Sequence, residues 1–335
     1  MSEIPRGAIR FNTDSNKPEL WDGSQWAEFQ LSYVGLGTGG DTGPGARGVS
    51  IAGYSGPAGN NVLDYFNISS TGNAIDFGYS TATGWNSAAC SSTTRGLYII
   101  TSPGSPVASN TIEFITISST GNGTNFGDTT TGSVIQRASC SSSTRGLFAG
   151  GGPVPTPSDV IDYVTIASTG SAQTFGNLTV ARANVTGCAS PTRGFFNGGY
   201  TPTNQNTIDF VTIATTGNAQ DFGDLTVSRY AEASLSNPTR GIFAGGLAVT
   251  NVIDFIVTAT LGNAQNFGDL NYSAGGAGGT ASSTRGVVFG GYSGPVGVDT
   301  MNYIIISTEG DAIDFGDLTT TKASTSGCSN AHGGL

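Results

Sequence analysis

The sequence predicts an all-β protein made of short repeated strands, and three observations lead to this prediction. Glycine supplies 52 of the 335 residues and only 11% of residues are charged, a composition typical of turn-rich β proteins. Val, Ile, Thr, Phe and Tyr dominate the apolar segments, as they do in strands, and no segment has the apolar spacing of a helix of useful length. The third observation is an internal repeat.

A six-fold repeat fills residues 47–332. Each unit has an Arg-Gly pair with a short apolar strand, a polar loop, a second apolar strand, a Phe-Gly pair and a small polar segment. The Arg-Gly pairs begin at Arg47, Arg95, Arg145, Arg193, Arg240 and Arg285. About 48 residues and four strands per unit match the blade of a β-propeller, in which neighbouring sheets cover both faces of each sheet. We therefore expect six four-stranded blades over residues 41–335.

The end of the sequence predicts how such a ring closes. Residues 321–330 read TKASTSGCSN, and the AHGGL that follows aligns with the segment around Arg95. The chain thus stops where a seventh unit would begin. We expect a C-terminal strand over 321–330 to join the blade that starts at Arg47 as its inner strand and to close the ring.

Residues 1–40 do not follow the repeat and predict a small β-hairpin module with a linker. The segment GAIRFNTDSNKPELWDGSQWAEFQ reads as three short strands, with Asp22-Gly23 at the second turn, a pair that favours tight hairpins. Two of the three tryptophans, Trp21 and Trp26, lie in this module. The glycine-rich stretch after it reads as a flexible linker.

The repeat resembles kelch-type propeller repeats. The resemblance rests on the Gly-Gly pair that ends the first strand, at 198–199, 245–246 and 290–291, and on the aromatic residue two strands later. The sequence departs from the kelch pattern because the Phe of Phe-Gly stands where Trp is usual. What the resemblance implies is a kelch-like architecture.

The N-terminal module resembles a segment common in bacteriophage tail-fibre and other virion proteins. The matching residues are Gly7, Ile9, Arg10, Phe11, Asn12, Thr13, Asn16, Lys17, Glu19, Trp21, Asp22, Gly23 and Trp26. The propeller repeat is similar to repeats in structural proteins of phages that infect marine bacteria and cyanobacteria. Together these resemblances imply a virion structural protein, assembled in the host cytoplasm and present in multiple copies per particle.

The resemblance further implies a non-enzymatic tail or tail-fibre component. Residues 1–40 would dock on other virion proteins through Arg10, Phe11, Trp21 and Trp26, and the propeller would present a surface for host attachment, to a glycan or receptor, or for neighbouring subunits. Two alternatives remain open. One is a capsid-attached decoration or head-fibre protein, and the other is a glycan-active propeller enzyme.

Charge and composition disfavour several other functions. The net charge of −10 opposes nucleic-acid binding and attachment to anionic lipid. No stretch approaches the ~18 apolar residues of a membrane span, and the N-terminus has no basic and then apolar signal segment. With one histidine, His332, a catalytic triad or a histidine-rich metal site is not expected, and we expect neither a metal nor a cofactor.

Two repeated features suggest chemistry but are interpreted as structural. One cysteine stands at the same repeat position in four units, namely Cys90, Cys140, Cys188 and Cys328. Because adjacent sheets are too far apart for disulfides, we expect buried free thiols. Asp-Phe-Gly begins at Asp76, Asp221 and Asp314 without the other motifs of a kinase, and predicts a turn-stabilising side chain.

The six Arg-Gly arginines have two interpretations, a ring of ligand-binding charge or a structural tie between blades. We favour the structural tie, with each arginine bound to a nearby carboxylate or to carbonyls. The candidate carboxylate partners stand in the second apolar strand of five units, at Asp64, Glu113, Asp162, Asp209 and Asp254.

The loop after each Arg-Gly strand varies most between units, and recognition residues concentrate in such loops. It holds Tyr54, Tyr200 and Tyr292, and Trp85 is the one tryptophan of the repeats. Aromatic side chains there can stack on sugar rings or anchor a protein partner, or can simply cover blade edges. GYSGP recurs at Tyr54 and Tyr292, in units that would be neighbours after closure. These two segments predict either one composite patch or shared turn chemistry.

Overall fold

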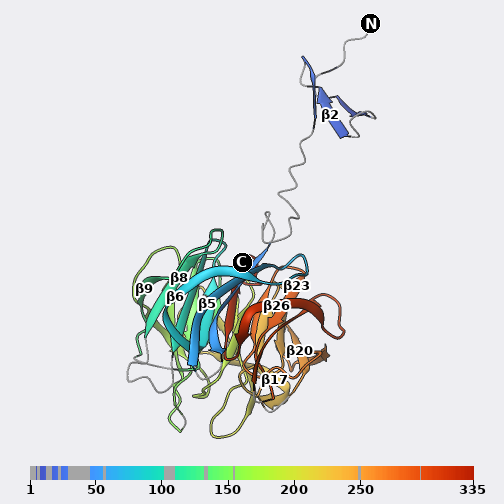
Figure 1. The fold of residues 1–335 in the computed structure, drawn as a ribbon. Coiled ribbons are helices and arrows are strands. Elements are labelled where there is room, and N and C mark those ends of the chain that lie inside the picture. Colours follow the sequence, from blue (N-terminus) through green and yellow to red (C-terminus); the bar gives the residue numbers. More distant parts are fainter. Residues whose placement is uncertain are drawn as a thin grey trace. The chain divides into compact units, whose positions relative to one another are not determined.

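The computed structural model describes residues 5, 8–12, 17–21, 24–28, 46–55, 58–101, 110–131, 135–153, 155–247, 250–294 and 296–335. The chain divides into two compact units, Met1–Gly43 and Pro44–Leu335. Among the described residues every regular element is a strand, and none is a helix (Figure 1). The predicted all-β class is confirmed.

The first unit contains one antiparallel sheet in the order β1-β2-β3. Its strands are β1 (Ile9–Asn12), β2 (Lys17–Trp21) and β3 (Trp26–Glu28). The register places Ile9 opposite Leu20 and Trp21 opposite Trp26. The predicted Asp22-Gly23 turn lies outside the described residues.

The second unit consists of antiparallel strands that follow the sequence repeat. They are β4 (Arg47–Ser55), β5 (Ala58–Asn67), β6 (Ile75–Ser91), β7 (Arg95–Thr101), β8 (Thr111–Thr116), β9 (Thr124–Asp128), β10 (Ala138–Ser141), β11 (Arg145–Ala149), β12 (Val160–Thr165), β13 (Gln173–Asn177), β14 (Thr186–Ala189), β15 (Arg193–Asn197), β16 (Gln205–Thr212), β17 (Gln220–Arg229), β18 (Ala233–Ser236), β19 (Arg240–Ala244), β20 (Val252–Val257), β21 (Gln265–Asp269), β22 (Gly278–Ala281), β23 (Arg285–Phe289), β24 (Tyr292–Ser293), β25 (Val296–Ile305), β26 (Ile313–Lys322) and β27 (Ser326–Ser329).

These strands form four-stranded sheets of one design. Three are β10-β11-β12-β13, β14-β15-β16-β17 and β18-β19-β20-β21, and a fourth, β22-β23-β25-β26, carries the short β24 beside β25. The long β6 belongs to two further sheets, β27-β4-β5-β6 and β6-β7-β8-β9. Each Arg-Gly pair begins the second strand of its sheet, so the last segment of one sequence unit is the first strand of the next sheet. This arrangement is propeller-like.

The C-terminal strand is shorter than the sequence predicts. β27 spans Ser326–Ser329 instead of 321–330, because residues 321 and 322 complete β26. β27 pairs with β4, and Cys328 lies opposite Val49. The strands β6, β10, β14, β18, β22 and β27 contact one another in that order, and β27 also contacts β6.

Apolar side chains from neighbouring sheets meet in shared clusters. In one of them, Phe195 and Phe210 of one sheet pack with Phe243 of the next. The glycine of Arg-Gly permits this close approach. A Cβ added to Gly194 would lie 2.6 Å from the Sγ of Cys140 in the preceding sheet, closer than any packed core allows.

The Asp-Phe-Gly segment forms a β-bulge where the sequence predicts a turn. In the first copy, Leu63 lies opposite Gly78 and Asp64 opposite Asp76, so Phe77 is the extra residue. The Oδ1 of Asp76 accepts a hydrogen bond from the Gly78 backbone N–H at 3.1 Å. The carboxylate therefore has the local stabilising role that was predicted for it, in a bulge.

Candidate functional site

The six Arg-Gly arginines tie neighbouring sheets together. Each guanidinium carbon lies 4.4–5.0 Å from the centroid of an aromatic ring in the next strand of its own sheet. Each also donates to a backbone carbonyl of another sheet, as Arg193 Nη1 does to Thr258 at 2.9 Å. The predicted bonds to carbonyls are present. The predicted pairing with the five acids is wrong, because those acids have other partners.

Four of the acids pair with a second set of cations, which the sequence analysis did not single out. The pairs are Asp64–Lys322 at 2.8 Å, Asp162–Arg137 at 3.0 Å, Asp209–Arg182 at 2.8 Å and Asp254–Arg229 at 2.9 Å. All eight side chains are at most 2% exposed. A threonine of the preceding sheet completes the group, as Thr226 Oγ1 donates to Asp254 at 2.6 Å. These buried groups are structural.

In the other two units a tyrosine takes the place of the cation. The fifth acid, Glu113, accepts a hydrogen bond from the Tyr98 hydroxyl at 2.8 Å. In the sixth unit the neutral Asn302 replaces the acid, and the Tyr272 hydroxyl donates to the carbonyl of Gly290 at 2.8 Å. In an equivalent position of another repeat, Arg182 Nη1 donates to the carbonyl of Gly198. The buried cation is therefore present in four of the six places, and a tyrosine hydroxyl takes part in the other two.

The four cysteines are buried and free, as predicted. Burial raises the pKa of Cys188 to about 12, so its thiol stays protonated and unreactive at neutral pH. His332 is also structural. Its Nε2 donates to the Ser91 carbonyl at 2.8 Å, its Nδ1 accepts from the Gly334 N–H, and burial lowers its pKa to about 4.

Three of the aromatic candidates, from the first and last repeats, converge in the second compact unit. The ring centroid of Tyr54 lies 5.5 Å from that of Trp85 and 6.0 Å from that of Tyr292. All three side chains are half-buried, and we call them the aromatic cluster. The tyrosines of the two recurring GYSGP segments therefore lie in one composite patch. Tyr200 does not join it and pairs with Tyr230 at 5.6 Å.

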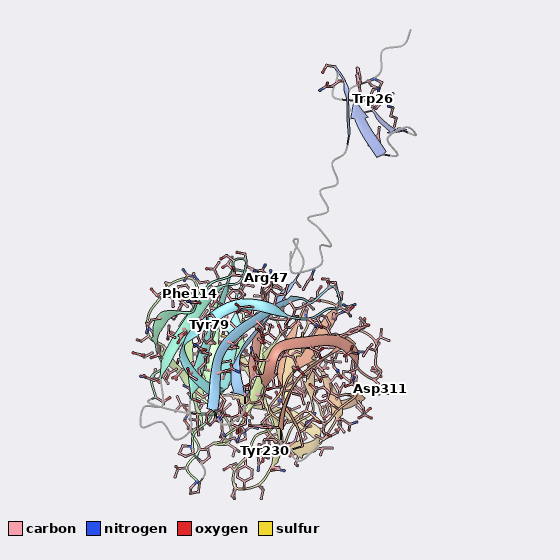
Figure 2. All side chains as sticks on the ribbon, viewed as in Figure 1. Trp26, Arg47, Tyr79, Phe114, Tyr230 and Asp311 are labelled. Carbon is pink, nitrogen blue, oxygen red and sulfur yellow. The ribbon has the colours of Figure 1, made fainter. Side chains whose placement is uncertain are left out.

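A cavity of about 480 Å³, the mouth cavity, lies in the same compact unit. Each repeat contributes one residue with a positive φ to its lining: Asn86, Gln136, Asn184, Ala231, Gly276 and Ser324. Tyr200, Tyr230 and Leu247 line one side, and Figure 2 shows Tyr230 at the end opposite Arg47. Tyr54 of the aromatic cluster pairs with Ala323, next to Ser324 of the lining, and this bridge connects the mouth cavity to the cluster.

Two charged residues lie at the floor of the mouth cavity. Arg137 and Glu232 line both the mouth cavity and the narrower space of about 70 Å³ below it. The residues at the same repeat position in the other units are Ser87, Val185, Ala277 and Thr325. The sequence analysis missed both residues. A charged side chain where the other units have a small or uncharged one was the signal that could have found them.

The predicted docking residues of the first unit lie partly together. The Arg10 guanidinium lies 4.3 Å from the Trp26 ring centroid, and the Trp21 and Trp26 rings are 5.5 Å apart. Phe11 belongs to β1, but its side chain lies outside the described residues. Ile9 is 67% exposed. The small sheet thus presents an apolar and a cationic group.

The described residues contain no group of three or more His, Cys, Asp or Glu side chains arranged to hold a metal ion. They also contain no helix long and apolar enough to cross a membrane. No protein-family model matches the chain, and no curated protein matches it.

Proposed function

We propose that this chain is a non-enzymatic structural protein of a bacteriophage virion, a tail or tail-fibre component that binds a host-surface ligand. The observation that carries the proposal is the convergence of Tyr54, Trp85 and Tyr292 beside the mouth cavity. Half-exposed aromatic rings next to a concave polar surface are typical of recognition sites for sugars and proteins.

The proposal includes a six-bladed kelch-like propeller whose ring is closed by β27. The first strands of the sheets contact one another in sequence, and the last of them, β27, contacts the first, β6. This pattern supports a closed ring. The lining of the mouth cavity supports it as well, because all six repeats contribute an equivalent residue. A closed ring leaves no open sheet edge between the first and last repeats.

The first unit is proposed to dock the protein on other virion proteins. The resemblance of residues 1–40 to tail-fibre segments supports this role. The exposed Ile9 and the stacked Arg10 and Trp26 supply groups that a partner could bury.

A non-enzymatic role is supported by the chemistry of the mouth cavity. Glycoside hydrolysis requires two carboxyl groups on opposite sides of the scissile bond. Among the described residues that line the mouth cavity, Glu232 is the one carboxylate. The lining residues therefore lack the acid and base pair that a glycan-active enzyme of this kind needs.

Binding can be tested with the full chain on an immobilised panel of bacterial surface polysaccharides. We expect Trp85→Ala to weaken retention at least tenfold, while Tyr79→Ala, a control at a 47% exposed tyrosine outside the cluster, retains it. Equal retention by both variants would contradict a role for the aromatic cluster.

Electron cryo-microscopy of the purified particle tests the location. Density on the tail, lost on removal of residues 1–40, is the expected result. Density on the capsid would replace the tail role with capsid decoration, and absence from the particle would contradict the virion assignment.

A further inference from the structure

Arg137 differs from the other buried arginines of its kind in the bonds that it makes. Arg182 Nη1 and Arg229 Nη1 both donate to backbone carbonyls, at 2.7 Å and 3.0 Å. Arg137 Nη2 binds Asp162 and the Phe148 carbonyl, but its Nη1 has no partner in the described part of the chain, where the Nε of all three arginines is unpartnered as well. A buried guanidinium with unused donors is costly unless something else accepts those bonds.

Glu232, on the other side of the same floor, lacks a hydrogen-bond donor for one of its carboxylate oxygens. Its Oε1 accepts from Asn197 Nδ2 at 2.6 Å, while its Oε2 has no partner among the described residues. The side chain is only 1% exposed. Val185 of the intervening unit lies between the two charged positions in the lining. One wall of the floor therefore offers unused donors and the other an unused acceptor.

We infer that the mouth cavity is a binding site for one neutral, polyhydroxylated sugar unit, held between Arg137 and Glu232. This inference rests on the proposed function, because it names the ligand class of the same end of the molecule. Sugar hydroxyls can both donate to Glu232 Oε2 and accept from Arg137 Nη1, so a ligand with several hydroxyls supplies the partner that each group lacks.

The remaining lining fits the same ligand. Asn86, Gln136 and Asn184 have amides that donate and accept, as a ring of hydroxyls requires. Tyr200 and Tyr230 supply an aromatic wall for the apolar face of a sugar ring. The volume of about 480 Å³ falls within the range of small-molecule sites.

Charge balance favours a neutral ligand over an ion. Arg137 already faces Asp162, and Glu232 lies near Arg229 and Arg182, which have their own aspartates. The floor therefore lacks hydrogen bonds and has no large excess of either charge. A ligand that brings hydroxyl groups corrects this deficit without adding a buried charge.

The test uses the full chain and ligand-observed NMR with four probes: the methyl glycosides of glucose, galactose, mannose and N-acetylglucosamine. We expect saturable binding of at least one probe. Glu232→Gln should weaken that binding at least tenfold, because the amide cannot accept at both oxygens. Glu309→Gln, a control at an exposed carboxylate, should bind as the parent does.

Arg137→Lys is the second variant, since it keeps a cation for Asp162 but has no second amino group for the sugar. It should also weaken binding at least tenfold while near-ultraviolet circular dichroism shows a folded chain. Binding of none of the probes would overturn the inference and leave the mouth cavity as a hydrated space. Binding of glycine or serine in place of the sugars would overturn it in favour of a zwitterion site.

The outcomes separate this inference from the proposed function. If the methyl glycosides bind but no polysaccharide is retained and the particle lacks the chain, the sugar site stands and the virion role fails. If polysaccharide retention depends on Trp85 but not on Glu232, the host-binding role stands and the sugar site fails.

Discussion

At the scale of single residues, the buried carboxylates at the second apolar strand each join two sheets. Asp254 of β20 binds Arg229 and Thr226, which both lie on β17 of the preceding sheet. Taking both charges out of water costs free energy that the geometry of the pair recovers. Removing one charge leaves the other buried without a counter-ion.

We therefore predict that Asp254→Asn lowers the free energy of unfolding by about 3–5 kcal/mol. Asp221→Asn, at an exposed carboxylate in the preceding sheet, should change it by less than about 0.5 kcal/mol. Urea denaturation followed by tryptophan fluorescence measures both. A loss at Asp254 no larger than that at Asp221 would show that the ion pair adds nothing to stability.

A second residue-scale prediction concerns Glu232 and pH. Burial raises its pKa from 4.5 to about 7, opposed by Arg229, by the hydrogen bond from Asn197 and by Arg182. The folded state then holds a proton that the unfolded state loses, so stability from this group falls as the pH rises from 4.5 to about 7. At about 1.4 kcal/mol per pH unit, the loss over that interval is about 3 kcal/mol.

The comparison of the parent with Glu232→Gln isolates this effect. The pKa of His332 is lowered to about 4, so its contribution has the opposite sign, being lost as the pH falls below 6.5, and it is common to both proteins. We expect the free energy of unfolding of the variant, minus that of the parent, to increase as the pH rises from 4.5 to 7. Parallel stability curves would rule out a proton on Glu232.

At the scale of elements, the Arg-Gly strand is fixed by what its glycine touches. A Cβ on Gly194 would meet Cys140 Sγ at 2.6 Å, and the φ of Gly194 is not in the positive range. We predict that Gly194→Ala destabilises the protein by about 1–3 kcal/mol through overpacking alone. Cys140→Ala should recover part of this loss, because it removes the sulfur atom.

A double-mutant cycle by thermal denaturation tests the pair. The coupling between Gly194→Ala and Cys140→Ala should be at least about 0.5 kcal/mol and favourable. Gly194→Ala combined with Cys328→Ala, a thiol that packs on Gly96 instead, should be additive. Additivity in both combinations would mean that the glycine is required for another reason.

The same elements show what the sequence can and cannot predict. The Arg-Gly, acidic and Phe-Gly strands were located from their repeat, because apolar runs between glycines have one period. The cations that pair with the acids were not predicted. Arg182, Arg229 and Lys322 lie far along the chain from the strands that they bind. Register also hid the β-bulge after Asp76, since a bulge depends on the neighbouring strand.

At the scale of the whole molecule, the aromatic cluster was predictable and the mouth cavity was not. The recurrence of GYSGP placed Tyr54 and Tyr292 in units that closure makes neighbours. The floor residues Arg137 and Glu232 come from repeats that are not adjacent, and only the folded arrangement of the sheets brings them to one surface. Singular departures from a repeat are therefore the residues to examine first in a protein of this kind.

The last prediction concerns the ring itself. β27 supplies the first strand beside β4, and Gly333 donates to the Ser236 carbonyl at 2.9 Å, so residues 326–335 contact repeats that are far apart in sequence. Deleting 326–335 would expose the edge of β4 and the apolar side chains behind it. We expect this variant to lose cooperative thermal unfolding and to aggregate, as size-exclusion chromatography and calorimetry would show. Deleting residues 1–40, which belong to the other compact unit, should leave the melting temperature of the repeats unchanged. A cooperative, monomeric protein without 326–335 would contradict a closed ring and favour an open stack of sheets.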